Sequence, residues 1–446
     1  MLKHCLTLGI IFFVSLTAKS AIDIDGTRYV DLTPAASTGL EKVFVVEDGQ
    51  VASITYTAQS VQASSSVKWY KFSALGGGYA EPVADVEYVN NKTTVRGLSS
   101  DIGYIVEDGG RQIAFWVVNY ANHHPTLTSL TISANSECDR VTFNTTGSFD
   151  RIVYYSVNGA PTEVDRDITL TYNDLEFHSI DDADGYWTVY EHQVHFPYIT
   201  NAVSTQAPLC NTAFKLSGDM FLKAWGEPVE IETSEYITSR VEAVTSAQQL
   251  LRDNDNEQQD ANSGLGGSAP CDITFSAIPT DAALFREWQF SETEDFIDVL
   301  YRFNEDVFTY TFTEAGTTYV KYVCADAIGN CTFEGDVYTV SIGESKLLCP
   351  NAFSPHNEDG VNDLWKVSYS SLISYECHIF NRWGKELFSS TNPAEGWDGR
   401  IGGKFVPSGV YFYVIKAEGA DGKKYSLKGD INIVGSKLKP TTGAEE

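Results

Sequence analysis

Residues 308–323 read Phe-Thr-Tyr-Thr-Phe-Thr-Glu-Ala-Gly-Thr-Thr-Tyr-Val-Lys-Tyr-Val, and this stretch decides the fold class. Phe308, Tyr310 and Phe312 alternate with threonines, so a β-strand would turn all three aromatic rings toward one face. Gly316 permits a turn, after which residues 319–323 return as a second apolar strand. The pattern predicts two strands that contribute to one hydrophobic core.

The same kind of pattern fills most of the chain. Short apolar strands are separated by turn residues at intervals of about ten residues, which is typical of β-sandwiches. The chain has 24 Tyr and 24 Phe but only 2 Met, which favours sheets over helices. Asp-Gly and Asn-Gly pairs that predict tight hairpins lie at 48–49, 108–109, 158–159, 184–185 and 421–422. We therefore expect an all-β fold of tandem immunoglobulin-like sandwiches, with one short helix and one acidic loop.

Charge excludes one large class of function. The 446 residues include 31 basic and 60 acidic side chains, for a formal net charge of −29. Such a chain repels nucleic acid phosphates, so a DNA- or RNA-binding role is excluded. With 43% apolar and 20% charged residues, most of the chain can bury a core.

The N-terminus has the features of a secretory signal peptide. Lys3 precedes an apolar stretch over 6–16, and Ala18 and Ser20 are the small residues that a signal peptidase requires. We expect cleavage after Ser20. Beyond it, no stretch reaches the roughly 20 apolar residues of a membrane-spanning helix, so no transmembrane segment is expected.

Export makes disulfides the default state of the cysteines. Seven remain after residues 1–20 are removed, and their spacing alone does not fix the connectivity. By proximity in the sequence we expect the pairs Cys138–Cys210, Cys324–Cys331 and Cys349–Cys377, with Cys271 left as a free thiol.

A polar stretch interrupts the strands. Residues 252–264 contain almost no apolar side chain, which predicts a solvated, mobile linker or a long insertion within a domain. Just before it, Val241, Val244, Ala247 and Leu251 share one face at helical spacing, which predicts a short helix. The expected segments are a signal peptide over 1–20, β-sandwiches over 21–134 and 135–230, a helix and linker over 231–264, and two further domains over 265–345 and 346–446.

The first of these two domains resembles a known family. Glu287-Trp288-Gln289-Phe290 is followed by the strand pair of residues 308–320 and by Asp326-Ala327-Ile328-Gly329-Asn330-Cys331. This order resembles a PKD-type immunoglobulin-like domain, although Ser291-Glu292-Thr293 stands where the family has Gly-Asp-Gly. The resemblance implies a sandwich with a buried tryptophan at Trp288.

The last domain carries several motifs in order. Residues 349–363 read Cys-Pro-Asn-Ala-Phe-Ser-Pro-His-Asn-Glu-Asp-Gly-Val-Asn-Asp, and they are followed by Asn-Arg-Trp-Gly at 381–384 and Gly-Trp-Asp-Gly at 396–399. This order resembles the type B C-terminal sorting domain of Bacteroidetes proteins, also called the gliding-motility-associated C-terminal domain. The matching residues are Asn351, Phe353, Pro355, Asp359, Gly360, Asn362, Asp363, Asn381, Arg382, Trp383, Gly384, Gly396, Trp397, Asp398, Gly399, Gly409 and Tyr411.

The resemblance implies a small β-sandwich that the type IX secretion translocon recognises. It also implies passage through the periplasm and delivery to the outer-membrane surface or the medium. We expect Arg382 to stack on Trp383 or to pair with an acid such as Asp398. A network that fixes turns is the favoured role of these residues, and a surface read by the translocon is the alternative.

One loop of this domain gathers side-chain oxygens around a glycine. The oxygens of Asn357, Asp359, Asn362 and Asp363 are of the kind that Ca²⁺ binds. The loop lacks the acid that the twelfth position of an EF-hand supplies, and a network of Asx turns is the favoured alternative. No other cofactor is expected.

Catalytic signatures are absent from the sequence. It contains no nucleophile elbow, phosphate-binding loop or dinucleotide fingerprint. We therefore expect a non-enzymatic exported protein whose N-terminal sandwiches are structural or adhesive. The alternatives are a glycan-binding or glycan-degrading protein built around Trp69, Trp116 and Trp187, and a component of the secretion or gliding apparatus.

Overall fold

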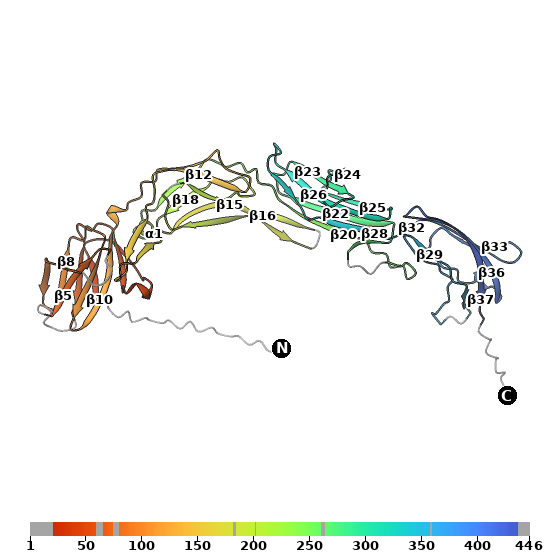
Figure 1. Ribbon diagram of the computed structural model, residues 1–446, viewed down its shortest axis with the longest axis horizontal. Coiled ribbons are helices and arrows are strands. Elements are labelled where there is room, and N and C mark those ends of the chain that lie inside the picture. The colour runs from red at the N-terminus through yellow and green to blue at the C-terminus, as the bar shows by residue number, and fades with distance from the viewer. Residues whose placement is uncertain are drawn as a thin grey trace, which may run out of the picture. The chain divides into compact units, whose positions relative to one another are not determined.

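Strands make up nearly all the regular structure of the computed structural model, which confirms the expected all-β fold of tandem sandwiches (Figure 1). The described residues are 21–58, 66–74, 80–181, 184–200, 202–259, 264–356 and 359–435. The expected signal peptide, Asn357 and the tail over 436–446 lie outside them. No helix within these ranges is both long and apolar enough to span a bilayer.

Two sheets form the first sandwich. One contains β1 (Ile22–Asp25), β4 (Ser53–Thr57), β8 (Lys92–Arg96) and β7 (Val86–Val89) in that order. The other contains β2 (Tyr29–Leu32), β3 (Lys42–Val46), β10 (Arg111–Asn119), β9 (Ile102–Asp108), β5 (Val67–Phe72) and β6 (Glu81–Pro82). The 3₁₀ turns are η1 (Ala36–Thr38) and η3 (Tyr120–Asn122).

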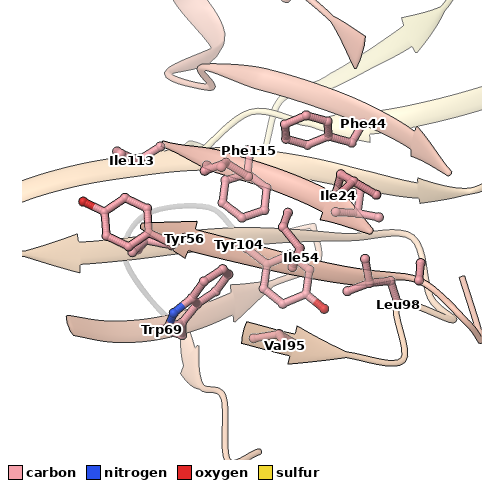
Figure 2. Packing of buried hydrophobic residues seen from close by; sticks show 14 of the residues in the cluster. Ile24, Phe44, Ile54, Tyr56, Trp69, Val95, Leu98, Tyr104, Ile113 and Phe115 are labelled. Atoms are coloured by element: carbon pink, nitrogen blue, oxygen red, sulfur yellow. The ribbon is translucent and has the colours of Figure 1, made fainter. Parts of the chain in front are cut away.

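Aromatic rings fill the space between these sheets (Figure 2). Trp69 and Phe115 lie in this core with ring centroids 6.0 Å apart, and the Trp69 indole N–H donates to Thr93 at 2.9 Å. The partnered N–H lets a large ring be buried without leaving a polar group unsatisfied.

The two Val-Glu-Asp-Gly segments have different structures. The turn at 108–109 joins β9 and β10 as an antiparallel hairpin, as predicted. The hairpin predicted at 48–49 is wrong, because β3 pairs with β2 and in parallel with β10, whereas β4 belongs to the facing sheet. Identical turn residues therefore lead here to a sheet-to-sheet crossing.

The second sandwich follows at residue 129. Its sheets contain β11 (Ser129–Ile132), β12 (Arg140–Thr146) and β17 (Val203–Gln206); β13 (Ile152–Tyr155) and β14 (Pro161–Val164); and β16 (Gly185–Phe196), β15 (Ile168–Ser179), β18 (Lys215–Gly218) and β19 (Val229–Glu232). The hairpin predicted at 158–159 is confirmed between β13 and β14.

The α-helix of the described residues is not where the sequence predicted it. Helix α1 (Met220–Trp225) begins after Asp219, whose Oδ1 accepts from the Leu222 N–H at 3.0 Å, and it ends at Gly226 with φ of +82°. The helix expected over 241–251 is wrong. Residues Ala243–Gln249 form β20, because they find a seven-residue antiparallel partner in β22.

The third sandwich has two sheets. One contains β20, β22 (Cys271–Pro279) and β25 (Val307–Phe312); the other contains β21 (Leu265–Gly267), β28 (Tyr338–Ile342), β26 (Gly316–Ala325), β23 (Phe285–Ser291), β24 (Val299–Phe303) and β27 (Thr332–Glu334). The two strands quoted first, β25 and β26, lie in opposite sheets. Phe308, Tyr310 and Phe312 pack with the buried Trp288, as the alternation predicted.

The C-terminal sandwich (residues 346–435) is the last. Its strands are β29 (Lys346–Leu348) with β31 (Ser368–Ser370); β30 (Ala352–Phe353), β37 (Lys424–Ile433), β36 (Gly409–Gly419), β32 (Leu372–Phe380) and β33 (Glu386–Ser390); and β34 (Arg400–Ile401) with β35 (Lys404–Phe405). The hairpin predicted at 421–422 joins β36 to β37.

The chain divides into two compact units. The first holds the first two sandwiches, apart from residues 174–190 and 208–210. The second holds those residues and everything from Thr238 onward. Within each unit, two sandwiches are joined by contacts that bear on function.

Candidate functional site

The turn between β32 and β33 presents Trp383 to solvent. The Asn381 Oδ1 accepts from the backbone N–H groups of Trp383 and Lys385, both at 3.0 Å. Gly384 has φ of +81°, a region that favours glycine, and its N–H donates to the Asn381 carbonyl at 3.0 Å. Asn381 and Gly384 thus fix a turn on which Trp383 is 76% exposed.

The Arg382 guanidinium stacks on this indole. Its Cζ lies 4.4 Å from the Trp383 ring centroid, within the range of a cation–π contact. Of the two partners expected for Arg382, the structure shows the ring. The Asp398 carboxylate instead accepts from the Arg400 backbone N–H at 2.9 Å.

A groove of about 500 Å³ opens beside the turn. The apolar side chains that line it include Leu387, Ile401, Val406, Pro407, Val410 and Phe412. Among the described residues of its lining, Arg382 and Lys385 are basic and none is acidic. The groove is therefore an apolar depression with positive charge at one side.

The groove continues onto the outer face of β36. This strand is apolar on both faces: Tyr411 and Ile415 are buried, whereas Val410, Phe412 and Val414 are 48%, 44% and 39% exposed. Phe412 lies opposite Phe380 of β32 in the register. The solvent-facing side of the sheet thus carries an apolar stripe, which we call the β36 stripe (Val410, Phe412, Val414).

Several predicted motif residues build the core instead. The backbone N–H groups of Trp365 and Trp397 donate to each other's carbonyls at 2.9 and 3.0 Å. The Trp397 ring is 5.5 Å from Phe353 and 5.4 Å from Tyr411, between centroids. These contacts make Trp397 a packing residue, although its flanking glycines resemble those of the exposed Trp383.

The remaining motif positions shape the backbone. Gly399 has φ of +70°, and a Cβ there would lie 2.8 Å from Pro355 Cγ. A Cβ at Gly396 would lie 2.6 Å from Lys366 Cγ. The Asn351 carbonyl accepts from the Asn432 N–H at 2.8 Å, and Gly409 has φ of +153°. The favoured turn-fixing role therefore suits these residues.

The acidic loop uses its carboxylates on its own backbone. Asp359 Oδ1 accepts from Val361 N–H at 2.9 Å, and Asp363 Oδ2 accepts from Gly360 N–H at 2.8 Å. The Asn362 carbonyl accepts from Ser354 N–H at 2.8 Å. These are the contacts of the Asx-turn alternative. Within the described ranges no group of three or more His, Cys, Asp or Glu could hold a metal ion.

The cysteines differ from the expected pairing. Cys138 and Cys331 each belong to a disulfide, whereas Cys210, Cys324, Cys349 and Cys377 keep their thiols. The pairs Cys138–Cys210, Cys324–Cys331 and Cys349–Cys377 are therefore wrong, because each contains a cysteine that keeps its thiol. Closeness in the sequence does not fix the register: in the β26–β27 pair, Cys324 lies opposite Phe333 and not opposite Cys331. Cys271 is a thiol, as expected. Burial raises the pKa of Cys324 and of Cys377 to about 11.

Part of the expected linker docks on the C-terminal sandwich. Gln258 N–H donates to the Tyr369 carbonyl at 2.6 Å, and Tyr369 N–H donates to the Asn256 carbonyl at 3.1 Å. The Glu257 side chain is fully buried and accepts from the Arg252 guanidinium at 2.5 Å. The prediction of a wholly solvated segment is wrong here, because its polar groups find partners on β31.

A buried polar cluster in the first unit escaped the sequence altogether. Arg166 Nε donates to Asp219 Oδ2 at 2.8 Å, and the Tyr120 hydroxyl donates to the same oxygen at 2.9 Å. Arg166 also donates to the Asp150 and His123 carbonyls, both at 2.9 Å. Tyr120 ends the first sandwich and Arg166 belongs to the second, so the cluster ties the two together.

An apolar cluster surrounds this tie. Trp116 and Val118 of β10 pack with Ile152 of β13 and with Phe221 and Trp225 of α1. Burial of side chains of this size is worth roughly 1.5–3 kcal/mol each. The first two sandwiches therefore share a core.

Comparison with known proteins identifies two parts of the chain. Residues 347–433 match the CHU_C type IX secretion signal domain, and residues 131–233 match a fibronectin type III domain. The C-terminal sandwich is thus a type IX sorting domain, and the chain is exported to the cell surface or the extracellular space. No curated protein matches the chain. The PKD-type resemblance of residues 265–345 stays a prediction.

Three solved structures are similar to the chain at low sequence identity. Sidekick-1 immunoglobulin domains 1–5 are 9% identical, cover 93% of this chain and 81% of their own, and give a TM-score of 0.24. The chicken CNTN1 FN1–FN3 domains are 11% identical, cover 70% and 99%, and give 0.22. Dimeric latent PorU from Porphyromonas gingivalis is 10% identical, covers 74% and 36%, and gives 0.15.

Proposed function

We propose that this chain, which carries a type IX secretion signal domain at its C-terminal end, displays its upstream sandwiches as a non-catalytic structural or adhesive segment. The observation that carries the proposal is the shared core of the first two sandwiches, closed by the fully buried pair Arg166 and Asp219. A continuous core holds neighbouring domains in a fixed arrangement, as a stalk or an adhesive surface requires.

Delivery is tested by truncation after residue 345 in a bacterium that has the type IX secretion system. We expect the full chain to be accessible to protease on intact cells or released to the medium, and the truncated chain to stay in the periplasm. Surface display of the truncated chain would contradict the cargo role. A stoichiometric outer-membrane complex that fails to assemble without the chain would instead identify an apparatus component.

A glycan-binding function is a second candidate, favoured by a different site from the one the sequence suggested. Trp69 and Trp116 lie in cores, and the half-buried Trp187 donates its indole N–H to the Ile278 carbonyl at 3.0 Å. On β16, however, Tyr186 is 52% exposed and stacks on His178, with centroids 5.6 Å apart.

Exposed aromatic faces can stack on sugar rings, and acids nearby can accept hydrogen bonds from hydroxyls. Asp174 and Glu176 lie close enough to Tyr190 to add to the raised pKa that burial gives its hydroxyl. A glycan array with the full chain and with Tyr186→Ala tests this candidate. The matched control is Tyr88→Ala, which removes a ring of 42% exposure elsewhere. Equal binding by both variants would exclude the site.

A further inference from the structure

We propose that the groove beside Trp383, together with the β36 stripe, is the surface on which a protein of the export machinery docks, and that the partner presents an apolar anchor flanked by carboxylates. The inference rests on the cargo role above and deepens it. It assigns the recognition to one face of the C-terminal sandwich and states the chemistry of the partner.

The first step is the exposure of Trp383. A tryptophan that is 76% exposed leaves a large apolar area in water, at a free-energy cost of roughly 25 cal/mol per Å². The sandwich buries its other tryptophans, Trp365 and Trp397, at 2% and 1% exposure. Because the domain buries two tryptophans and leaves Trp383 in solvent, the Trp383 indole is available to a partner.

The second step is that the turn carrying the indole is fixed before anything binds. Asn381 Oδ1 accepts two backbone hydrogen bonds of the turn, and the Arg382 guanidinium covers one part of the ring. An indole carried on a fixed turn loses less conformational entropy on association than one carried on a flexible loop. Trp, Tyr and Arg are also the residues that most often dominate binding energy at interfaces.

The third step is continuity. The groove lining includes Val410 and Phe412, which also belong to the β36 stripe. Single exposed apolar residues are common on proteins, whereas a groove joined to an apolar stripe and an exposed tryptophan is a feature of interaction sites.

The fourth step selects the partner by charge. Residues 346–446 carry 12 basic and 12 acidic side chains, although the whole chain carries 31 and 60. The entire net charge of −29 therefore belongs to the upstream region. The described lining of the groove has two cations and no acid. Electrostatic complementarity favours a partner with carboxylates at this point, and the net negative charge of the upstream region disfavours its binding there.

The experiment uses the full chain in a bacterium with the type IX system. The variants are Trp383→Ala and the double change Arg382→Glu with Lys385→Glu. Their matched controls are Ile373→Ala, an exposed apolar residue of β32 outside the groove lining, and the double change Lys346→Glu with Lys424→Glu, which alters the net charge equally.

We expect both groove variants to lower the surface-exposed fraction about tenfold, with the missing protein found folded in the periplasm. Both controls are expected to reach the surface like the unchanged chain. Thermal unfolding of each purified variant separates a docking defect from a folding defect. Normal display of both groove variants would overturn the proposal, while loss of display on truncation after residue 345 would leave the cargo role standing.

A photo-crosslinker placed by Ile401→p-benzoylphenylalanine identifies the occupant directly, because Ile401 lines the groove. Crosslinking to an acidic segment of another protein, lost in the Arg382→Glu and Lys385→Glu background, is the expected result. Crosslinking to lipid, polysaccharide, a basic segment or a second copy of this chain would overturn the proposal, as would normal export with no adduct at all.

Discussion

Arg166 and Asp219 form an ion pair in which both side chains are fully buried, with Arg166 Nη2 2.6 Å from Asp219 Oδ2. The Arg166 guanidinium also donates to the Tyr120 hydroxyl and to the His123 and Asp150 carbonyls. For a buried ion pair with these hydrogen bonds, removing one partner destabilises the fold more than replacing both partners with apolar residues.

Arg166→Met is expected to lower the free energy of unfolding by about 3–5 kcal/mol, because Asp219 is left buried and uncompensated. The measurement is urea unfolding of residues 21–446. The control is Asp31→Asn, which removes the exposed Lys42–Asp31 pair and should cost less than about 1 kcal/mol. Equal effects would mean that burial of the pair is irrelevant to stability.

Glu257→Ala tests the docked segment. The carboxylate accepts from Arg252 and from the Asn254 side chain at 2.8 Å, and with burial it helps to raise the pKa of Tyr369 to about 12. Removing it should destabilise the C-terminal sandwich by about 1–3 kcal/mol. Hydrogen exchange at the Tyr369 amide, which donates to Asn256 O, should accelerate. Unchanged protection there would show that the segment is not held.

Alanine substitutions at two glycines distinguish the cost of backbone strain from the cost of a steric clash. Gly147 and Gly97 have φ of +84° and +73°, but a Cβ at Gly147 would lie 2.0 Å from the Thr126 carbonyl oxygen, whereas none of the described atoms approaches one at Gly97 within 4 Å. Gly97→Ala should cost about 1–2 kcal/mol, and Gly147→Ala on the order of 3–5 kcal/mol. Thermal unfolding gives both values, and similar costs would refute the steric argument.

The half-buried His378 on β32 should make stability depend on pH. Its hydrogen bonds to Glu376, at 3.1 Å, and Glu386, at 2.8 Å, raise its pKa above the ordinary value. The protonated ring thus stabilises the fold below the ordinary histidine pKa of about 6.5, and the contribution is lost as pH rises through the raised value.

His378→Gln is accordingly expected to be less stable than the unchanged chain at about pH 5.5, by up to about 1 kcal/mol, and equally stable at about pH 9. Urea unfolding at both values measures the difference. A loss that is the same at both pH values would assign the effect to packing.

Buried thiols should resist alkylation. With pKa values of about 11, Cys324 and Cys377 hold almost no thiolate at about pH 8, and thiolate is the reactive form. Mass spectrometry after N-ethylmaleimide treatment should find both unmodified in the folded chain and modified in denaturant. Rapid labelling of either in the folded chain would contradict the burial of that thiol.

The outcomes at particular residues show what the sequence could predict. Alternation at Phe308, Tyr310 and Phe312 predicted a buried face, because side-chain direction in a strand follows from local geometry. The helix predicted from Val241 to Leu251 failed, because pairing with Cys271–Pro279 overrides a local spacing. Asp219 and Gly226 carried the cap signals of the actual helix, and these could have located it.

The site shows the same division. The motifs identified the domain. Both Trp383 and Trp397 have glycine neighbours, however, so the sequence did not show which of the two is exposed and which is buried. Trp397 is buried because Trp365, supplied by a distant segment, pairs with its backbone. Glu257 likewise had no local signal for burial, since Tyr369, the residue against which it packs, lies on another sandwich.

The β-bridge between Glu257 and Tyr369 determines which residues must be included when the sorting domain is fused to another protein. A reporter fused at residue 346 would inherit β31 with its outer edge bare, which invites edge-to-edge aggregation. The segment that covers this edge, residues 256–258, lies between β20 and β21 in the sequence. A fusion that keeps it must therefore begin at Thr238, where the second unit resumes. The transplantable piece is therefore a pair of sandwiches and not the last one alone.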